Sequence, residues 1–207
     1  YALDVLDIKT PLELLRAATI ETGNQDKVRF ALDVAASSFF KDGKYFVNGE
    51  YISGDELGKI YDNLINEFNL LSIEDPFEEE DFEGFANLLG KHPGLRILGD
   101  DLTTTNKELV QKAIDKQSIN AMIIKPNQIG TLTETLDTMK LARENGVDCI
   151  VSHRSGETND DFIADLAYAF GCYGLKSGAP QKEERAIKYR RLIEITNNDL
   201  PDSRKVK

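Results

Sequence analysis

One stretch of this sequence gathers side chains that bind anions. Ser152, His153, Arg154 and Ser155 follow an apolar, β-branched run and precede an amphipathic segment. The guanidinium of Arg154 offers a planar pair of donors for a phosphate or a carboxylate, and the serine hydroxyls add further donors. Strand, polar turn and helix in this order are typical of α/β proteins, whose sites lie at the carboxyl ends of strands. The stretch therefore predicts an anion site.

Three carboxylates follow apolar segments elsewhere in the chain: Asp33, Glu74 and Asp100. A single acid in such a position is most often a solvated or salt-bridged loop residue, but three at successive strand ends are harder to explain in that way. Oxygen donors without a histidine or cysteine cluster are typical of a hard divalent cation. Mg²⁺ suits such a site best, because it takes oxygen ligands and also bridges to anionic ligands. We therefore expect these three residues to bind Mg²⁺.

Two lysines, Lys125 and Lys176, directly follow apolar runs. Near a metal ion and another cation, the pKa of a lysine can fall far enough for it to act as a general base. A lysine that only pairs with a carboxylate is equally consistent with the spacing, and His153 could equally be a core residue. Metal, lysine base and arginine together suit one chemistry, which is removal of a proton beside a carboxylate with stabilisation of the resulting enolate.

Strands that alternate with helices must position these residues. Apolar runs at 27–34, 70–73, 95–98, 121–124, 147–152 and 171–175 predict six strands. Such alternation predicts a parallel sheet with helical crossovers, as either an open doubly wound sheet or a TIM-type (β/α)₈ barrel. Polar residues at successive strand ends, and the lack of a glycine-rich phosphate loop, favour the barrel. We expect an incomplete α/β barrel of about six βα units, two short of the eight in a complete one.

Capping and turn residues mark several element ends. Residues 10–13 (TPLE) and 53–56 (SGDE) match the capping box of a helix, and Asp81 is expected to cap another helix. Asp42-Gly43 and Asn48-Gly49 predict a small hairpin in the loop after the first strand. A final helix over 183–195 precedes the charged residues 198–207, which we expect to form a disordered tail.

Composition narrows the class of protein. The 207 residues suffice for one sizeable domain, and the net charge of −11 argues against a partner that is a nucleic acid. The two cysteines lie in apolar runs, as buried thiols in a reducing compartment do. The sequence has neither an apolar run of about 18 residues, which a membrane span needs, nor a signal peptide, so we expect a cytoplasmic protein. Because the sequence begins at Tyr1, we also expect it to be a fragment or a processed product.

Six motifs together resemble the enolase (phosphopyruvate hydratase) family. They occur in the order and at the spacing of that family and cover nearly the whole chain, which is far more specific than any one motif. The motifs are 31–37 (ALDVAAS), 72–77 (SIEDPF), 99–103 (GDDLT), 125–131 (KPNQIGT), 152–158 (SHRSGET) and 176–180 (KSGAP).

The resemblance implies a lyase of glycolysis and gluconeogenesis that interconverts 2-phosphoglycerate and phosphoenolpyruvate with release of water. It implies that the three carboxylates hold a first Mg²⁺, which bridges the substrate carboxylate, and that Lys125 removes the proton beside that carboxylate. The substrate-binding residues that it implies, besides Lys125, are Ser152, His153, Arg154, Ser155 and Lys176. Among these, Lys176 would contact the carboxylate, Arg154 and Ser155 would bind the phosphate, and the loop would adjoin a second Mg²⁺.

Members of that family also have an N-terminal domain, two earlier barrel strands and a catalytic glutamate that helps expel hydroxide, and none of these has a counterpart here. We therefore expect residues 1–197 to be part of an enolase C-terminal barrel, inactive or nearly so alone, within a full-length enolase. That full-length protein is expected to be a homodimer or a larger homo-oligomer.

Two other functions remain open. Another member of the enolase superfamily, such as a racemase or a sugar-acid dehydratase, shares the metal carboxylates but generally lacks the 152–158 signature. A non-catalytic binding or structural protein could retain the barrel, although the presence of Lys125 and Arg154 argues against decay of the site. A phosphoglycerate-dependent titration with Mg²⁺ would discriminate between these functions.

Overall fold

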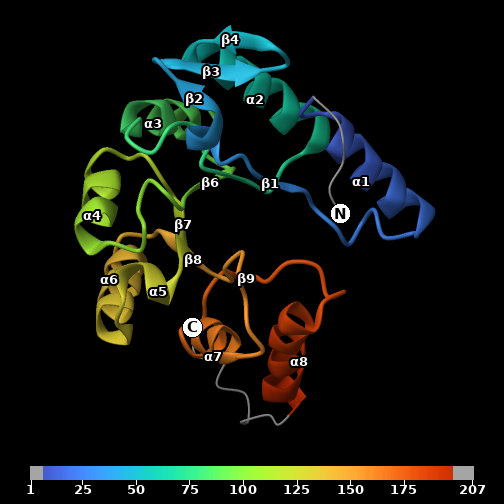
Figure 1. Cartoon of the computed structure of the whole chain (residues 1–207), viewed down its shortest axis with the longest axis vertical. Coiled ribbons are helices and arrows are strands. Elements are labelled where there is room, and N and C mark those ends of the chain that lie inside the picture. The colour runs from blue at the N-terminus through green and yellow to red at the C-terminus, as the bar shows by residue number, and fades with distance from the viewer. Residues whose placement is uncertain (1–6, 198–207) are drawn as a thin grey trace. The chain divides into compact units, whose positions relative to one another are not determined.

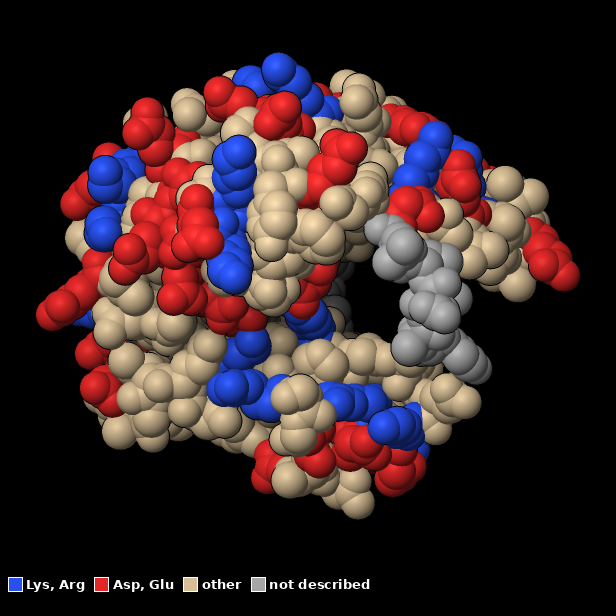
Figure 2. Space-filling view, turned by 45° about the horizontal axis from the view of Figure 1, so that its top comes forward, with Lys and Arg blue, Asp and Glu red and all other residues tan. Residues whose placement is uncertain are grey.

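The structure, a computed structural model, describes residues 7–197 (Figure 1). The chain divides into two compact units, one formed by Tyr1–Thr103 with Glu108–Ala121 and the other by Thr104–Lys107 with Met122–Lys207. The expected tail, residues 198–207, lies outside the described residues. On the face drawn in Figure 2, Asp and Glu side chains are widespread and Lys and Arg side chains lie among them.

The first unit contains half of the predicted βα alternation. Its elements are α1 (Thr10–Glu21), β1 (Ala31–Asp33), η1 (Ala36–Phe39), β2 (Phe40–Lys41), β3 (Lys44–Val47), β4 (Glu50–Ile52), α2 (Gly54–Phe68), β5 (Ser72–Glu74), α3 (Phe82–Lys91), β6 (Arg96–Gly99) and α4 (Lys107–Asp115). Strands β1, β5 and β6 lie side by side in that order and are parallel, as the alternation predicts.

Burial explains the extent of these strands. Ile73 in β5 and Ile97 in β6 are 0% exposed, so the apolar residues of the central strands lie in the core. By contrast, Val28 is 43% exposed, and β1 pairs with β5 through only three residues. The predicted strand over 27–34 was therefore too long, because most of its alternating apolar residues do not lie in the paired strand.

Helix capping agrees with the sequence at two positions. The Ser53 hydroxyl accepts the N–H of Glu56 at 3.3 Å, and the Glu56 carboxylate accepts the N–H of Ser53 at 2.8 Å. This reciprocal pair is the predicted capping box of α2. At α3, the Asp81 carboxylate accepts the N–H of Gly84 at 2.8 Å, as expected.

The predicted capping box at residues 10–13 is wrong. Helix α1 already includes Thr10, and the side chain of its cap residue, Lys9, accepts no hydrogen bond. Asp7 does the capping instead, because its carboxylate accepts the N–H groups of Lys9 at 3.0 Å and Thr10 at 2.7 Å. The Thr10 hydroxyl also donates to Asp7, at 2.7 Å.

The predicted hairpin is present and is larger than expected. Strands β2, β3 and β4 form an antiparallel sheet, so there are two turns, one at Asp42-Gly43 and the other at Asn48-Gly49. All four turn residues have positive φ, which is the backbone geometry of tight two-residue hairpin turns. Tyr45 in β3 is 2% exposed and its hydroxyl accepts the N–H of Glu78 at 3.0 Å, so the small sheet is attached to the loop after β5.

The second unit contains the remaining predicted elements. These are β7 (Ala121–Ile124), α5 (Pro126–Ile129), α6 (Leu132–Glu144), β8 (Asp148–Ser152), α7 (Phe162–Ala169), β9 (Gly174–Lys176) and α8 (Glu183–Asn197). The strand order is β7, β8, β9, and β8 is parallel to β9. The short helix α5 was not predicted; it begins with Pro126, whose fixed φ suits a first helical turn. Helix α8 lies against α7.

Both cysteines belong to this second unit and have free thiols. Burial raises the pKa of Cys149 to about 12 and that of Cys172 to about 11. The expected buried thiol is found at Cys149, whereas Cys172 is partly exposed. Within residues 7–197, no helix has the length and apolarity that crossing a membrane requires.

Candidate functional site

The three predicted metal carboxylates follow neighbouring strands of the first unit. Asp33 ends β1 and pairs in register with Glu74, which ends β5. Glu74 pairs in turn with Leu98, two residues before Asp100. Partners in register share one face of a sheet, and side chains two residues apart along a strand share a face as well. The register therefore places Asp33, Glu74 and Asp100 on one face at the carboxyl ends of their strands.

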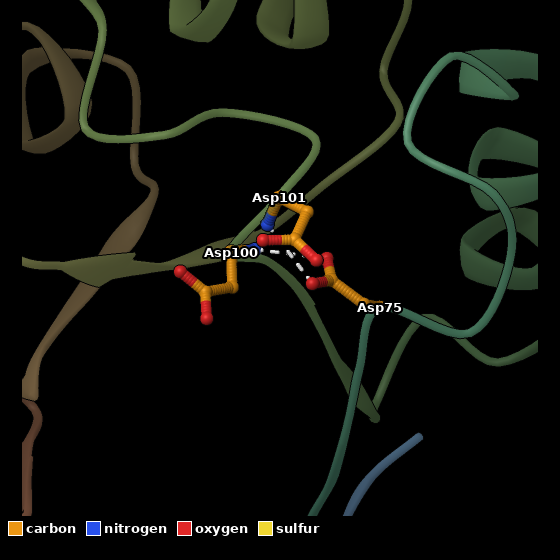
Figure 3. Close-up of side chains that lie close together, drawn as sticks. All are labelled: Asp75, Asp100 and Asp101. Atoms are coloured by element: carbon orange, nitrogen blue, oxygen red, sulfur yellow. Dashed lines mark hydrogen bonds between the residues drawn. The ribbon is translucent and has the colours of Figure 1, made fainter. Parts of the chain in front are cut away.

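The most closely spaced acidic side chains of this unit are a different set of three residues (Figure 3). One carboxylate oxygen from each of Asp75, Asp100 and Asp101 lies within 4.8 Å of the other two. Among residues 7–197, these three form the group of acids whose spacing could hold a metal ion. The structure does not bring Asp33, Glu74 and Asp100 together into such a cluster. In Figure 3 the Asp100 side chain points away from Asp75 and Asp101. The shared face of Asp33, Glu74 and Asp100 and their oxygen donors support these residues as metal ligands. Their assignment to a metal stays a prediction.

Asp75 supports the loop that carries Asp100. It is 3% exposed, and its two oxygens accept the N–H groups of Asp100 and Asp101, each at 2.9 Å (Figure 3). Its own backbone has φ of 43°, and its N–H donates to the Leu98 carbonyl at 3.0 Å. Burial raises the pKa of Asp75 to about 7, against the effect of the two N–H groups. Because both oxygens already accept backbone donors, Asp75 is better suited to holding this loop than to binding a metal.

Lys125 lies at the start of α5 in the second unit. Its N–H donates to the Thr105 hydroxyl at 2.9 Å, and that hydroxyl donates to the Gln128 side chain at 3.2 Å. The Thr138 hydroxyl donates to the Thr105 carbonyl at 3.1 Å. Thr105 is 0% exposed and has φ of 57°. A buried threonine in a fixed, unusual conformation therefore holds the backbone from which the Lys125 side chain extends.

The predicted anion-binding loop begins where β8 ends. Ser152 pairs in register with Lys176, and the N–H of His153 donates to the Lys176 carbonyl at 2.9 Å. The Ser152 side chain is buried, and its hydroxyl donates to the His153 carbonyl at 3.0 Å. Arg154 donates from Nη1 to the Asn127 side chain in α5 at 2.9 Å, and Ser155 is exposed. The second unit thus brings the Arg154 side chain against the short helix that Lys125 begins.

The charges around His153 are mostly positive. Burial lowers the pKa of His153, as do Arg185, Lys176 and Lys125, whereas Glu157 opposes them. The two predicted lysines are thus close enough to the ring to disfavour its charged form. The structure therefore brings Lys125, Lys176 and His153 into one positive environment, which favours anionic ligands.

Three residues that sequence reasoning missed support this loop. Arg185 in α8 donates to the carbonyls of Arg154 at 2.9 Å and Ser155 at 3.1 Å. Lys188, one turn further along α8, is 0% exposed; it donates to the Thr158 carbonyl at 2.5 Å and lies 3.5 Å from the Glu157 carboxylate. Burial would raise the pKa of Glu157, but the N–H groups of Thr158 and Arg154, together with Lys188, lower it. In the sequence, Arg185 and Lys188 are only charged residues of a helix and Glu157 is only part of the 152–158 motif, so nothing in the sequence indicated these roles.

The lowered pKa of His153 leads to a prediction about acid stability. A base whose pKa is lower in the folded than in the unfolded state stabilises the fold above its ordinary value of 6.5, and this contribution is lost as pH falls through the folded pKa. We expect wild type to lose more stability than His153→Gln between about pH 7.5 and about pH 5, as measured by urea unfolding. Equal acid sensitivity of wild type and His153→Gln would contradict the prediction.

Comparison with known proteins identifies the family of this chain. Residues 1–205 match the family model described as "Enolase, C-terminal TIM barrel domain". An enolase of Methanocaldococcus jannaschii is 49% identical over 184 residues, which are 89% of this chain and 43% of that protein. Enolases of Methanococcus aeolicus and Campylobacter lari are 46% and 42% identical, and each match covers 94% of this chain. The chain therefore spans about half the length of these curated relatives. The predicted fold class, an incomplete TIM-type barrel, is confirmed, and the chain belongs to the enolase family.

Proposed function

We propose that the complete product of this gene catalyses the Mg²⁺-dependent dehydration of 2-phosphoglycerate to phosphoenolpyruvate. The observation that supports this most directly is the positive environment of the second unit. There Lys125 and Lys176 both act electrostatically on His153, and Arg154 lies against the helix that Lys125 begins. A substrate with a carboxylate and a phosphate needs such a set of cationic groups.

In the first unit, Asp33, Glu74 and Asp100 would hold the metal ion. Their fit rests on chemistry and register, because all are carboxylates and all follow strands whose register places them on one face. Such oxygen ligands suit a hard divalent cation, for which we propose Mg²⁺. When bound, the ion would supply the positive charge that stabilises an enolate. Asp75 would keep the loop with Asp100 in place through its two backbone hydrogen bonds.

In the second unit, Lys125 would take the proton beside the substrate carboxylate. A general base must be neutral before it accepts a proton. Lys176 would bind the carboxylate, and it is the last residue of β9, the strand that pairs with β8. Arg154 and Ser155 would bind the phosphate, with Ser152 and His153 in the same loop.

The activity of the 207-residue chain by itself is a separate question. The relatives named enolase are about twice as long as the segment that matches. We propose that residues outside this segment complete the reaction, so that the chain alone turns over little substrate. We also propose that the complete protein is a cytoplasmic homodimer or larger homo-oligomer whose partner is a small-molecule substrate and not a nucleic acid.

Direct measurement of product formation tests this function. The complete gene product is incubated with 2-phosphoglycerate, and phosphoenolpyruvate is followed by its ultraviolet absorbance. We expect turnover with Mg²⁺, its loss on chelation with EDTA and its return on re-addition of Mg²⁺. The same assay on the 207-residue chain should give little or no product. If the complete protein binds 2-phosphoglycerate but forms no product with Mg²⁺, a non-catalytic binding function takes the place of this proposal.

A further inference from the structure

One arginine of α8 makes three contacts with the loop that follows β8. Arg185 donates from Nη1 to the Arg154 carbonyl at 2.9 Å and from Nη2 to the Ser155 carbonyl at 3.1 Å. Nη1 also forms a hydrogen bond with Nδ1 of His153. A guanidinium has only donors and does not lose its proton in proteins, so Nδ1 of His153 must be the acceptor. A ring nitrogen that accepts a hydrogen bond carries no proton.

We propose that Arg185 is a positioning residue, which holds His153 as the neutral tautomer with its proton on Nε2 and fixes the backbone of the anion-binding loop. The proposal rests on the proposed function only for the identity of the ligand, a phosphate. The tautomer and the loop contacts stand on the geometry of α8 and the loop.

The surroundings of the pair restrict its geometry. Gly178 has φ of +74°, and a Cβ atom there would lie 3.1 Å from Cε1 of His153 and 3.4 Å from Cδ of Arg185. The Tyr189 hydroxyl donates to the Gly178 carbonyl at 2.5 Å, and the Ser177 hydroxyl donates to the Arg185 carbonyl at 3.3 Å. The ring and the guanidinium thus lie close to a backbone that is itself held by hydrogen bonds from two side chains.

The charged groups around the ring also favour its neutral form. Arg185 from α8, Lys176 from β9 and Lys125 from the end of β7 are cationic, and Glu157 in the same loop is the opposing carboxylate. Glu157 already accepts the N–H groups of Arg154 and Thr158 and pairs with Lys188. A proton on Nδ1 would remove the acceptor that faces Arg185, and in the doubly protonated ring it would also add a positive charge beside three others.

This tautomer limits what His153 can do. Its one remaining donor is Nε2–H, which can form a hydrogen bond with an anionic oxygen of a ligand. A neutral imidazole does not act as a general acid near neutral pH, because that would leave an imidazolate. His153 would therefore be a fixed donor for the anion and not a source of the proton that a leaving group needs.

Nitrogen NMR of ¹⁵N-histidine-labelled 207-residue chain measures the tautomer directly. The chain has two histidines, so His92→Gln assigns both signals. At about pH 7.5 we expect the His153 spectrum of a neutral ring with an unprotonated Nδ1 and a protonated Nε2. A proton on Nδ1, in either the other neutral tautomer or the charged ring, would overturn the proposal. This measurement uses the wild-type chain, so it tests the tautomer of His153 even if no variant folds.

Two arginine variants extend the test. In Arg185→Met we expect a mixture of tautomers at His153 and a higher pKa of the ring, whereas Arg185→Lys should keep the pKa low. The matched control is Arg190→Met, which removes an arginine of the same helix that is 51% exposed and pairs with Glu183. The control should leave the His153 spectrum as in wild type. An unchanged His153 spectrum in a folded Arg185→Met chain would overturn the proposal.

Kinetics of the complete protein separate this proposal from the proposed function. We expect Arg185→Met to raise KM for 2-phosphoglycerate about tenfold or more, with a smaller change in kcat, because the loop no longer presents its donors correctly. If the tautomer shifts but even wild type forms no phosphoenolpyruvate, the positioning role stands and the proposed function fails. If wild type is active and KM does not change in Arg185→Met, the positioning role in phosphate binding fails.

Discussion

Replacing Lys125 with alanine in the complete protein should lower kcat by about 10²–10⁴-fold, the usual contribution of a general base. The physical reason is specific to the position of this lysine. Its backbone is fixed by the buried Thr105 hydroxyl, and its side chain lies near the cationic groups that surround His153. Alanine keeps the backbone hydrogen bond and removes the side chain beyond Cβ, including the amine, so we expect the fold to persist.

Two measurements make this prediction sharp. Loss of phosphoenolpyruvate formation reports the whole reaction, and exchange of the substrate proton with deuterated solvent reports proton removal alone. Lys125→Ala should lower both rates by a similar factor, because the base acts before any group leaves. Lys140→Ala is the matched control, since Lys140 is a 71% exposed lysine of α6 in the same unit. Solvent exchange at the wild-type rate in Lys125→Ala would show that another group is the base.

The sequence was sufficient for those features of the fold that depend on local chemistry. The capping box at Ser53 and Glu56, the cap at Asp81 and the two turns with Asn or Asp before Gly are all found in the structure. Each depends on residues within about four positions of one another, so the sequence contains all of the interaction. The capping box predicted at residues 10–13 was wrong because a better acceptor, Asp7, lies just upstream.

In the candidate site, too, some residues could be predicted from the sequence and others could not. The positions of its proposed ligand-binding side chains could be predicted, because strand ends carry them and alternating elements repeat along the chain. The groups that position them could not. Thr105 lies 20 residues before Lys125, and Arg185 lies 32 residues after His153. No sequence period relates such pairs, and only the packing of α8 and the 104–107 segment beside these loops brings them together.

Asp75 was missed for a related reason. It directly follows the predicted ligand Glu74, so the sequence offers two adjacent acids without distinguishing their roles. The structure distinguishes them by backbone conformation, because Asp75 adopts a positive φ and turns its carboxylate to the N–H groups of Asp100 and Asp101. Its partners lie 25 and 26 residues further along the chain. Glu74 is therefore a predicted ligand, and the adjacent Asp75 holds in place the loop of a second predicted ligand, Asp100.

Replacing Asp75 with alanine should destabilise the first unit by about 2–5 kcal/mol, because a buried N–H without an acceptor costs about 1–3 kcal/mol and two lose their acceptor here. Urea unfolding of the 207-residue chain measures the loss. Asp75→Asn keeps one acceptor oxygen and should lose roughly half as much. Asp26→Ala removes an exposed aspartate of the same unit and should change stability little.

The dependence of this loss on pH follows from the raised pKa of Asp75. An acid whose pKa is about 7 in the folded state and 3.8 ordinarily stabilises the fold most below its ordinary pKa, and that contribution is lost as pH rises to about 7. The difference between wild type and Asp75→Ala should therefore be larger at about pH 5 than at about pH 8. A difference that grows with pH would instead mean that Asp75 is stabilised as a carboxylate.

Metal affinity gives an independent readout of the same variant. If Asp75 positions the loop with Asp100, its loss should weaken Mg²⁺ binding to the complete protein by about 10–100-fold, as removal of supporting hydrogen bonds around metal ligands does. Titration calorimetry at about pH 8 measures this under conditions where wild type and variant are both folded. Asp100→Asn should weaken binding at least as much, because it alters the proposed ligand itself. Unchanged Mg²⁺ affinity in a folded Asp75→Ala protein would show that the hydrogen bonds from Asp100 and Asp101 support the fold of this loop and not the metal site.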